Sequence, residues 1–165
     1  MKIVRLVFSM ISPEQFFFAR DGWVPNHPTL PVKIYSAAVN SSASDFETLF
    51  RKNGWPPQWQ GGVFSYHHYH SITHEVLGCA AGWAHLILGG PHGKEVRLQA
   101  GDAVLLPVGT GHCCLTASDD FLVVGGYPPG CNFDICREEP TSSMLERIAR
   151  LDSYPSDPVT GSRLA

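Results

Sequence analysis

The sequence predicts an all-β fold of antiparallel strands, arranged as a sandwich or barrel, with a short helix toward each end of the chain. Short apolar or alternating runs recur between residues 62 and 127, separated by glycine-rich turns at intervals of roughly ten residues. Charged residues make up only 16% of the 165 residues, whereas the chain contains 16 glycines and 13 prolines. Turns are therefore plentiful and highly charged helical surfaces are not.

The composition also excludes several classes of protein. Hydrophobic residues reach 44%, which supports a sizeable core and does not fit a disordered chain or a coiled coil. The 12 Lys and Arg residues are scattered and are outnumbered by 15 Asp and Glu residues, for a formal net charge of −3, so we expect no nucleic-acid partner. No apolar stretch approaches the ~20 residues that span a bilayer, so no membrane partner is expected.

The N-terminus and the cysteines favour a cytoplasmic location. The apolar run at residues 1–8 is broken by Arg5 and lacks a cleavage motif, which argues against a signal peptide. The five cysteines form no CxxC pair and are odd in number, so free thiols in a reducing compartment are the simpler interpretation.

Residues 1–58 are expected to form an arm followed by a helix. Prolines at positions 25, 28 and 31 restrict any strand between residues 16 and 40 to an edge or an arm. A helix is expected over residues 44–53, where Ser44 and Glu47 form a capping box and aromatic residues share one face. Trp55-Pro56-Pro57 then breaks the chain. The tryptophans of this part could cover a barrel mouth or a dimer surface; they are Trp23, Trp55 and Trp59.

Residues 59–130 are expected to form the β core and residues 131–165 a helix and tail, all within one domain over residues 1–165. The expected strands span residues 63–70, 75–81, 84–88, 95–98, 103–106, 112–116 and 121–124. A second capping box, Ser143 with Glu146, predicts the start of the C-terminal helix. The polar tail after Asp152 is expected to be loosely held.

Histidine is concentrated in one part of the chain. Seven of the 8 histidines lie between residues 67 and 112. On a strand, His68 and His70 point to the same face. If residues 71–74 form a hairpin loop, Glu75 lies opposite His70 and shares that face. A tight turn at residues 108–111 delivers His112 to the start of the next strand, and barrel closure could bring it to the same point.

These residues carry a resemblance to the cupin superfamily. The first cupin motif, G-x5-H-x-H-x4-E-x6-G, is matched at Gly62, His68, His70, Glu75 and Gly82. Most of the second, G-x5-P-x-G-x2-H-x3-N, is matched at Gly101, Pro107, Gly109 and His112. Thr116 stands where the family usually has Asn, a structural position. From about residue 13 to about residue 160 the chain looks like the YjlB-type small single-domain cupins.

The resemblance implies an antiparallel jelly-roll barrel (a double-stranded β-helix), often a homodimer. It also implies one divalent metal, with His68, His70, Glu75 and His112 as ligands. Imidazoles with one carboxylate suit Fe, Mn, Ni, Co, Cu or Zn and disfavour Ca and Mg. Four protein ligands on an octahedral ion would leave positions open for water, substrate or dioxygen.

Glu75 is also the candidate for a ligand that could dissociate and serve as the catalytic base. The other candidates for site roles are weaker. Tyr66, His74 and Cys114 are candidate substrate-binding residues, against the plainer expectations of core for Tyr66 and Cys114 and of a solvated loop for His74. Phe64 and Leu77 are expected in the pocket wall or the core, Cys79 and Thr116 on inward faces, and His67 at the surface or beside the ligands. His85 and His92 are expected to be structural or exposed.

Two classes of function remain open. The first is a metal-dependent enzyme acting on a small organic molecule, with oxygenase chemistry ahead of isomerase or lyase chemistry. The second is a non-catalytic small-ligand binding or sensory cupin, in which the metal holds a ligand or only stabilises the barrel. Fold alone does not separate them, because the same barrel hosts many functions.

Overall fold

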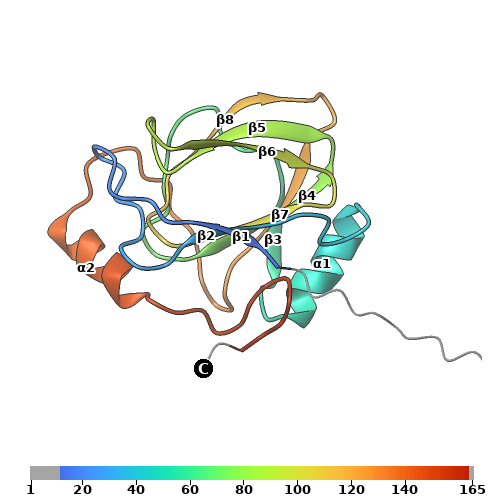
Figure 1. Cartoon of the computed structure of the whole chain (residues 1–165). Helices are drawn as coiled ribbons and strands as arrows, with labels where there is room; N and C mark the ends of the chain where they lie inside the picture. The colour runs from blue at the N-terminus through green and yellow to red at the C-terminus, as the bar shows by residue number, and fades with distance from the viewer. Residues whose placement is uncertain (1–11, 164–165) are drawn as a thin grey trace, which may run out of the picture.

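The computed structural model describes residues 12–163, which form two antiparallel β-sheets that face each other (Figure 1). The larger sheet has the order β1-β2-β7-β4-β9-β3 and the smaller one the order β6-β5-β8. The strands are β1 (Glu14–Phe16), β2 (Val32–Tyr35), β3 (Pro57–Gly61), β4 (Glu75–Ala81), β5 (Trp83–Leu88), β6 (Lys94–Gln99), β7 (Ala103–Leu106), β8 (His112–Ala117) and β9 (Leu122–Gly126). The helices are α1 (Ala43–Lys52) and α2 (Ser142–Arg150).

The predicted antiparallel β-rich fold with two helices is confirmed, but the two sheets do not close into one hydrogen-bonded barrel. Within residues 12–163 the strand ladders stay inside each sheet. An isolated bridge, which belongs to neither sheet's ladders, joins His68 to His112, the first residue of β8. The two sheets are instead held face to face by apolar side chains.

Most of the predicted strands are present. β4 and β7 have the predicted bounds, and β5, β6, β8 and β9 lie within two residues of them. The strand expected at residues 63–70 is wrong, because His68 bonds to His112 while Tyr69 bonds to Cys136, so no single partner extends a ladder. β3 was not predicted. It pairs with β9 alone at the sheet edge, where Pro57 is tolerated.

Both helices begin earlier than their predicted caps. The Ser42 side chain, not Ser44, caps α1 by accepting a 3.0 Å hydrogen bond from Asp45 N. Thr141, not Ser143, caps α2 by accepting from Met144 N at 3.1 Å. In each case a hydroxyl residue two positions upstream takes the extended conformation that a cap needs.

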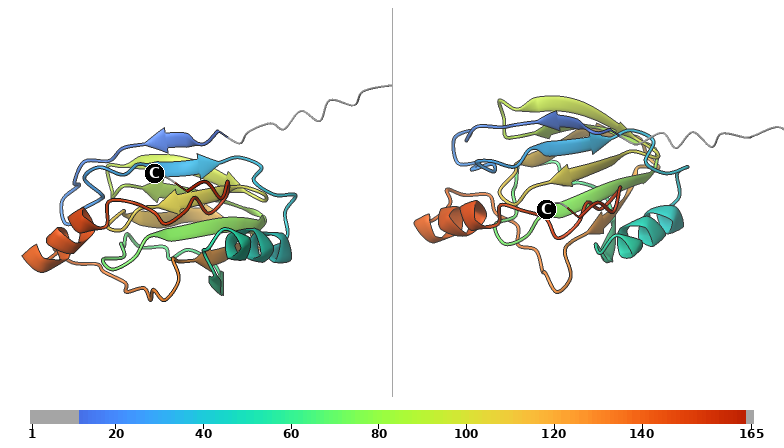
Figure 2. Two further views of the ribbon diagram at one scale, coloured as in Figure 1. Left: turned by 90° about the horizontal axis from the view of Figure 1, so that it is seen from below. Right: turned by 60° about the horizontal axis from the view of Figure 1, so that its bottom comes forward.

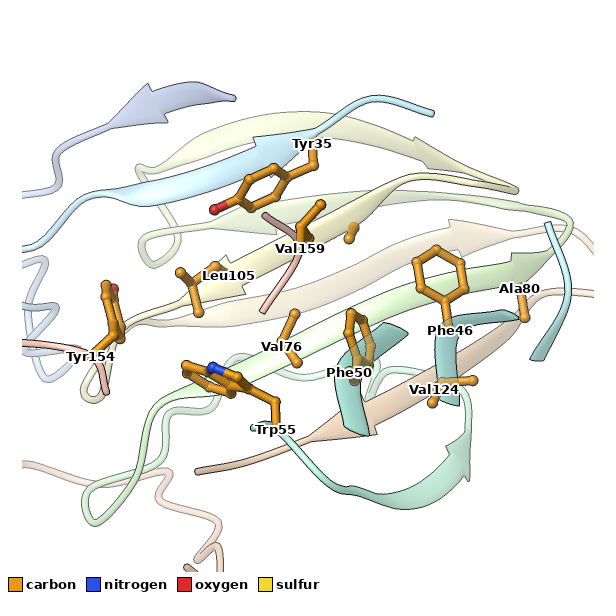
Figure 3. Close-up of a cluster of buried hydrophobic side chains, with 11 residues drawn as sticks. Tyr35, Phe46, Phe50, Trp55, Val76, Ala80, Leu105, Val124, Tyr154 and Val159 are labelled. Atoms are coloured by element: carbon orange, nitrogen blue, oxygen red, sulfur yellow. The ribbon is translucent and has the colours of Figure 1, made fainter. Parts of the chain in front are cut away.

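Two apolar cores lie on opposite faces of the larger sheet. Alternate residues of β4 serve both, since Val76 faces the outer core while Leu77 and Cys79 face the core between the sheets. The inward face expected for Cys79 is therefore confirmed. Figure 3 shows the outer core, in which Phe46 and Phe50 of α1 pack with Trp55 over the sheet.

The C-terminal segment completes the outer core, so the prediction of a loosely held tail is wrong. It runs from α2 across the outer face of the larger sheet toward α1 (Figures 1 and 2). Tyr154 and Val159 are buried in the core, and the hydroxyl of Tyr35 donates to Asp157. The polar composition of this segment gave no indication that a few of its side chains pack into the core.

No helix within residues 12–163 has the length and apolar character needed to cross a membrane. All five cysteines are free thiols, as expected. The argument against a signal peptide concerns residues 1–8, which lie outside the described residues.

Candidate metal centre and cavity

Three histidines converge between the sheets, close to one end of β8. One ligand atom from each of His68, His70 and His112 lies within 4.8 Å of the others, and all three side chains are buried. His112 is the first residue of β8, and reciprocal backbone bonds of 3.2 and 3.0 Å pair it with His68. The bridge places these two imidazoles side by side, with ring centroids 4.0 Å apart.

Each of these rings is oriented by a backbone carbonyl. His68 Nδ1 lies 3.0 Å from Tyr66 O, His112 Nδ1 lies 3.0 Å from Thr110 O, and His70 Nδ1 bonds to Asp134 O. A carbonyl oxygen only accepts hydrogen bonds, so each Nδ1 carries a proton. A neutral ring in this tautomer presents an unprotonated Nε2, which is the form that binds a metal.

Glu75 joins the histidines from the first position of β4. Its Oε1 lies 3.2 Å from His70 Nε2 and 3.3 Å from His112 Nε2. Glu75 is not part of the group whose ligand atoms all lie within 4.8 Å of one another, which consists of the three histidines. Its Oε2 accepts a 2.6 Å hydrogen bond from the hydroxyl of Tyr127. That hydroxyl in turn accepts a 2.7 Å bond from Trp59 Nε1. Every oxygen of this buried carboxylate therefore has a polar neighbour.

The His70–Glu75 contact was predicted, but the chain reaches it by a different path. His70 is not part of a strand, and no hairpin ladder places it opposite Glu75. Instead Gly109 N donates to His70 O at 2.7 Å, and the side chain of Asp134 accepts from Ser71 N at 2.7 Å. These contacts hold the segment before β4 in an irregular, largely buried conformation.

The buried charges of the centre support one another. Burial opposes ionisation of Glu75, but His70 and His112 outweigh it and hold the pKa of Glu75 well below its ordinary value. Burial likewise opposes protonation of His70, yet Glu75 raises the pKa of His70 above its ordinary value. Burial, with His112 nearby, lowers the pKa of His68 to about 3. These pKa directions favour an ionised Glu75 beside a protonated His70, with His68 neutral.

A cavity of about 180 Å³ opens onto the four side chains. The rest of its wall is almost entirely apolar, and the predicted wall residues Phe64 and Leu77 are part of it. The remaining wall residues were not predicted to line a pocket, except that Trp59 was expected to cover a barrel mouth or a dimer surface. They are Trp59, Gly62, Val63, Tyr127, Phe133 and Ile135.

The three candidate substrate-binding residues do not line this cavity. Tyr66 lies beside it, stacked on Phe64 with ring centroids 4.9 Å apart. Cys114 packs against the core between the sheets, as the plainer expectation held. His74 is neither a cavity residue nor a solvated loop residue, because it is buried beside Tyr154.

His74 is one of two histidines that fasten the C-terminal segment. Its Nδ1 accepts a 3.0 Å bond from Val108 N, and its Nε2 donates to Ser153 O at 3.2 Å. His27 uses the same tautomer, with Nε2 donating to Leu151 O at 2.9 Å. Both therefore have a structural role away from the cavity.

Local structure explains where the other polar residues lie and what they contact. Thr116 is exposed, not inward, because the β5–β8 register shifts between His85 and Leu86 and reverses the alternation of β8. His85 lies 3.1 Å from Glu95, and His92 lies 3.0 Å from Asp21. His67 is partly buried, and its Nδ1 has no hydrogen-bond partner within residues 12–163.

Tyr127, Phe133 and Asp134 are residues of the centre or its cavity that the sequence did not single out, and Trp59 was expected only to cover a barrel mouth or a dimer surface. Trp59 lies on the unpredicted strand β3, and Tyr127 directly follows β9. Phe133 and Asp134 lie in an irregular segment that has no periodic pattern. The one available signal was the position of Tyr127 at the end of an apolar strand, where a side chain can reach a site.

Comparison with known proteins identifies a relative of nearly the same length. No family model matches the chain. Among solved structures, acireductone dioxygenase from Bacillus anthracis, with a cadmium ion in its active centre, aligns at a TM-score of 0.33 and 22% identity, over 62% of this chain and 51% of that one. The uncharacterized protein YjlB of Bacillus subtilis (strain 168) is 38% identical over 152 residues, which cover 91% of this chain and 92% of that protein. The chain therefore belongs to the family of YjlB.

Proposed function

We propose that the protein is a cupin of the jelly-roll type that binds one divalent transition metal and acts on a small organic molecule. The proposed ligands are His68, His70, Glu75 and His112. One observation carries the proposal: three buried imidazoles, each oriented through Nδ1 by a backbone carbonyl, present Nε2 to a common point beside a buried carboxylate.

The donor set fits such a metal. Three imidazole nitrogens and one carboxylate oxygen suit Fe, Mn, Co, Ni, Cu or Zn. A divalent cation would displace any proton on His70 Nε2, which lies 3.2 Å from Glu75 Oε1, and the carboxylate would neutralise one of its two charges. When bound, the metal would act as a Lewis acid toward oxygen atoms of the substrate.

The surrounding residues would perform the remaining tasks. Tyr127 holds Glu75 through its 2.6 Å bond, and the apolar wall excludes bulk water from the centre. Glu75 would have to leave the metal to act as a base, and its Oε1 would then be the atom that accepts a substrate proton. This arrangement supports an oxygenase, isomerase or lyase. The alternative is a non-catalytic cupin that holds a small ligand.

Elemental analysis of protein purified without a His-tag tests the metal site. We expect close to one equivalent of a transition metal in the wild type, and loss of that metal in both His68→Ala and His112→Ala. His85→Ala is the matched control, because His85 lies on β5 and contacts Glu95 rather than the centre. Retention of stoichiometric metal in both site variants, with circular dichroism showing native folds, would refute the assignment.

Turnover assays separate the two classes of function. We expect an enzyme to show substrate-dependent oxygen uptake or product formation across a panel of small acids and aromatic compounds. Metal-dependent thermal stabilisation by a ligand, without product, would favour the binding protein. The homodimer and the cytoplasmic location remain predictions, and light scattering of the purified protein tests the first.

A further inference from the structure

Among the described residues, the polar groups that line the cavity belong to the proposed metal ligands and to Tyr127. The hydroxyl of Tyr127 is already bound to Glu75 and Trp59. Within residues 12–163, no Lys, Arg, Asn, Gln, Ser or Thr lines the cavity. The nearby guanidinium of Arg137 lies over the ring of Tyr66, 3.8 Å from its centroid, and Tyr66 is not part of the wall.

Flat rings form much of the apolar wall. Tyr127 and Phe133 stack with centroids 5.2 Å apart and an interplanar angle of 14°. The indole of Trp59 lies directly against the backbone of Gly125, where an added Cβ would come within 2.2 Å of it. The bond from Trp59 Nε1 to Tyr127 fixes these aromatic groups relative to each other. Trp59 and Tyr127 are therefore held in place, which lowers the entropic cost of binding a flat ligand against them.

The rim of the cavity is apolar as well. Phe64, Phe133 and Ile135 are 46%, 41% and 43% exposed. They are half of the large hydrophobic side chains that are exposed within residues 12–163; the others are Phe17, Ile72 and Leu115. Apolar side chains that gather around one opening mark a surface that a ligand covers.

We propose that the ligand is a small molecule with one metal-binding polar end and a flat, uncharged apolar remainder, about the size of a single substituted ring. The size follows from the volume, because an apolar cavity of about 150 Å³ holds benzene and this one measures about 180 Å³. A second charged end, as in a dicarboxylate, a phosphate ester or an amino acid, would be buried without a partner. This inference rests on the proposed metal centre.

Three carboxylates of increasing complexity test the inference on the zinc-loaded protein. Acetate, benzoate and terephthalate offer the metal the same group, and zinc avoids redox chemistry. By isothermal titration at pH 7, we expect benzoate to bind at least about tenfold tighter than acetate, because its ring covers apolar wall. We expect terephthalate to bind at least about tenfold more weakly than benzoate, because its second carboxylate meets no cation.

Three variants show whether the wall is responsible. Phe133→Ala is expected to weaken benzoate binding several-fold and to leave acetate binding unchanged. Leu115→Ala is the matched control, because Leu115 is 47% exposed but lies outside the cavity. Ile135→Arg places a cation at the rim and is expected to improve terephthalate binding relative to benzoate.

The outcomes distinguish a failure of this inference about the ligand from a failure of the proposed metal centre. Zinc binding with acetate or terephthalate preferred over benzoate would overturn the inference and leave the metal centre intact. Failure to bind zinc would overturn the metal centre. The wall is then tested in the same protein with benzyl alcohol, an uncharged ring: binding that Phe133→Ala weakens supports the apolar ligand class, and absence of binding refutes it.

Discussion

Tyr127 donates a 2.6 Å hydrogen bond to Glu75 Oε2, while Glu75 Oε1 faces His70 and His112 at 3.2 and 3.3 Å. Burial raises the pKa of Tyr127, and the negative charge of Glu75 raises it further, so the hydroxyl stays protonated and can donate. Tyr127 thus orients the carboxylate from outside the proposed ligand set.

Removal of this hydroxyl should weaken metal binding without abolishing it. Loss of a group that orients a metal ligand typically costs about 10–100-fold in affinity, and we expect Tyr127→Phe to fall in this range. Competition between the protein and a chromogenic zinc chelator measures the change. Tyr154→Phe is the control, because the buried Tyr154 hydroxyl has no partner within residues 12–163. Equal zinc affinity of Tyr127→Phe and the wild type would contradict this role.

A methyl group at Gly125 should disturb the cavity wall. An added Cβ would lie 2.2–2.5 Å from the Trp59 indole, so we expect Gly125→Ala to displace Trp59 and break its bond to Tyr127. Overpacking of this kind costs about 1–3 kcal/mol in free energy of unfolding, which urea denaturation followed by tryptophan fluorescence would detect.

Gly62 provides the control for Gly125. It also lines the cavity, but an added Cβ there meets nothing within 4 Å. Gly62→Ala should therefore change the stability by less than about 0.5 kcal/mol. Equal effects of the two substitutions would show that the Trp59 contact with Gly125 is unimportant.

His27 should make the protein less stable in acid. Burial lowers the pKa of His27 below its ordinary value of 6.5, and its Nδ1 accepts bonds from Thr29 N and Leu30 N at 3.1 and 2.9 Å. The unfolded chain then binds more protons than the folded one below pH 6.5, so stability falls as the pH is lowered from 6.5 toward the folded-state pKa.

Replacement of His27 by Asn isolates this contribution. Asn keeps an acceptor near the two amides, lacks the titrating group, and loses the bond to Leu151 O, which costs about 1 kcal/mol at every pH. Urea denaturation between pH 7.5 and pH 4.5 should show a smaller loss of stability on acidification for His27→Asn than for the wild type. Parallel curves for the two proteins would rule out a role for His27.

The C-terminal segment should be necessary for stability. A chain that stops at Asp152 loses the buried side chains of Tyr154 and Val159 and the carbonyl of Ser156, which accepts a 3.0 Å bond from Trp55 Nε1. Burial of one large apolar side chain contributes about 1.5–3 kcal/mol, so we expect a loss above roughly 3 kcal/mol in thermal or urea denaturation. A chain that ends at Arg163 keeps these contacts and is the control. Matching stability of the two chains would contradict the packing role.

Local patterns predicted much of the fold and the grouping of three of the proposed ligands, whereas His112 was proposed from the resemblance to the second cupin motif. Strand alternation and turn residues depend on neighbours a few positions apart, so β4 and β7 could be delimited from the sequence. The grouping of His68, His70 and Glu75 was predicted because they lie within eight positions of one another. The register shift in β8 shows the limit of such patterns, because it reversed the expected face of Thr116 without any signal in the sequence.

Contacts between distant segments were decided by the tertiary structure alone. Tyr127 reaches Glu75 across 52 residues, Trp59 reaches Tyr127 across 68, and the carbonyl of Asp134 orients His70 across 64. Such contacts depend on how the sheets and connecting segments pack, which no local propensity encodes. The sequence by itself determined which side chains are suited to hold a metal; packing decided which aromatic groups surround them, and therefore what kind of ligand the cavity favours.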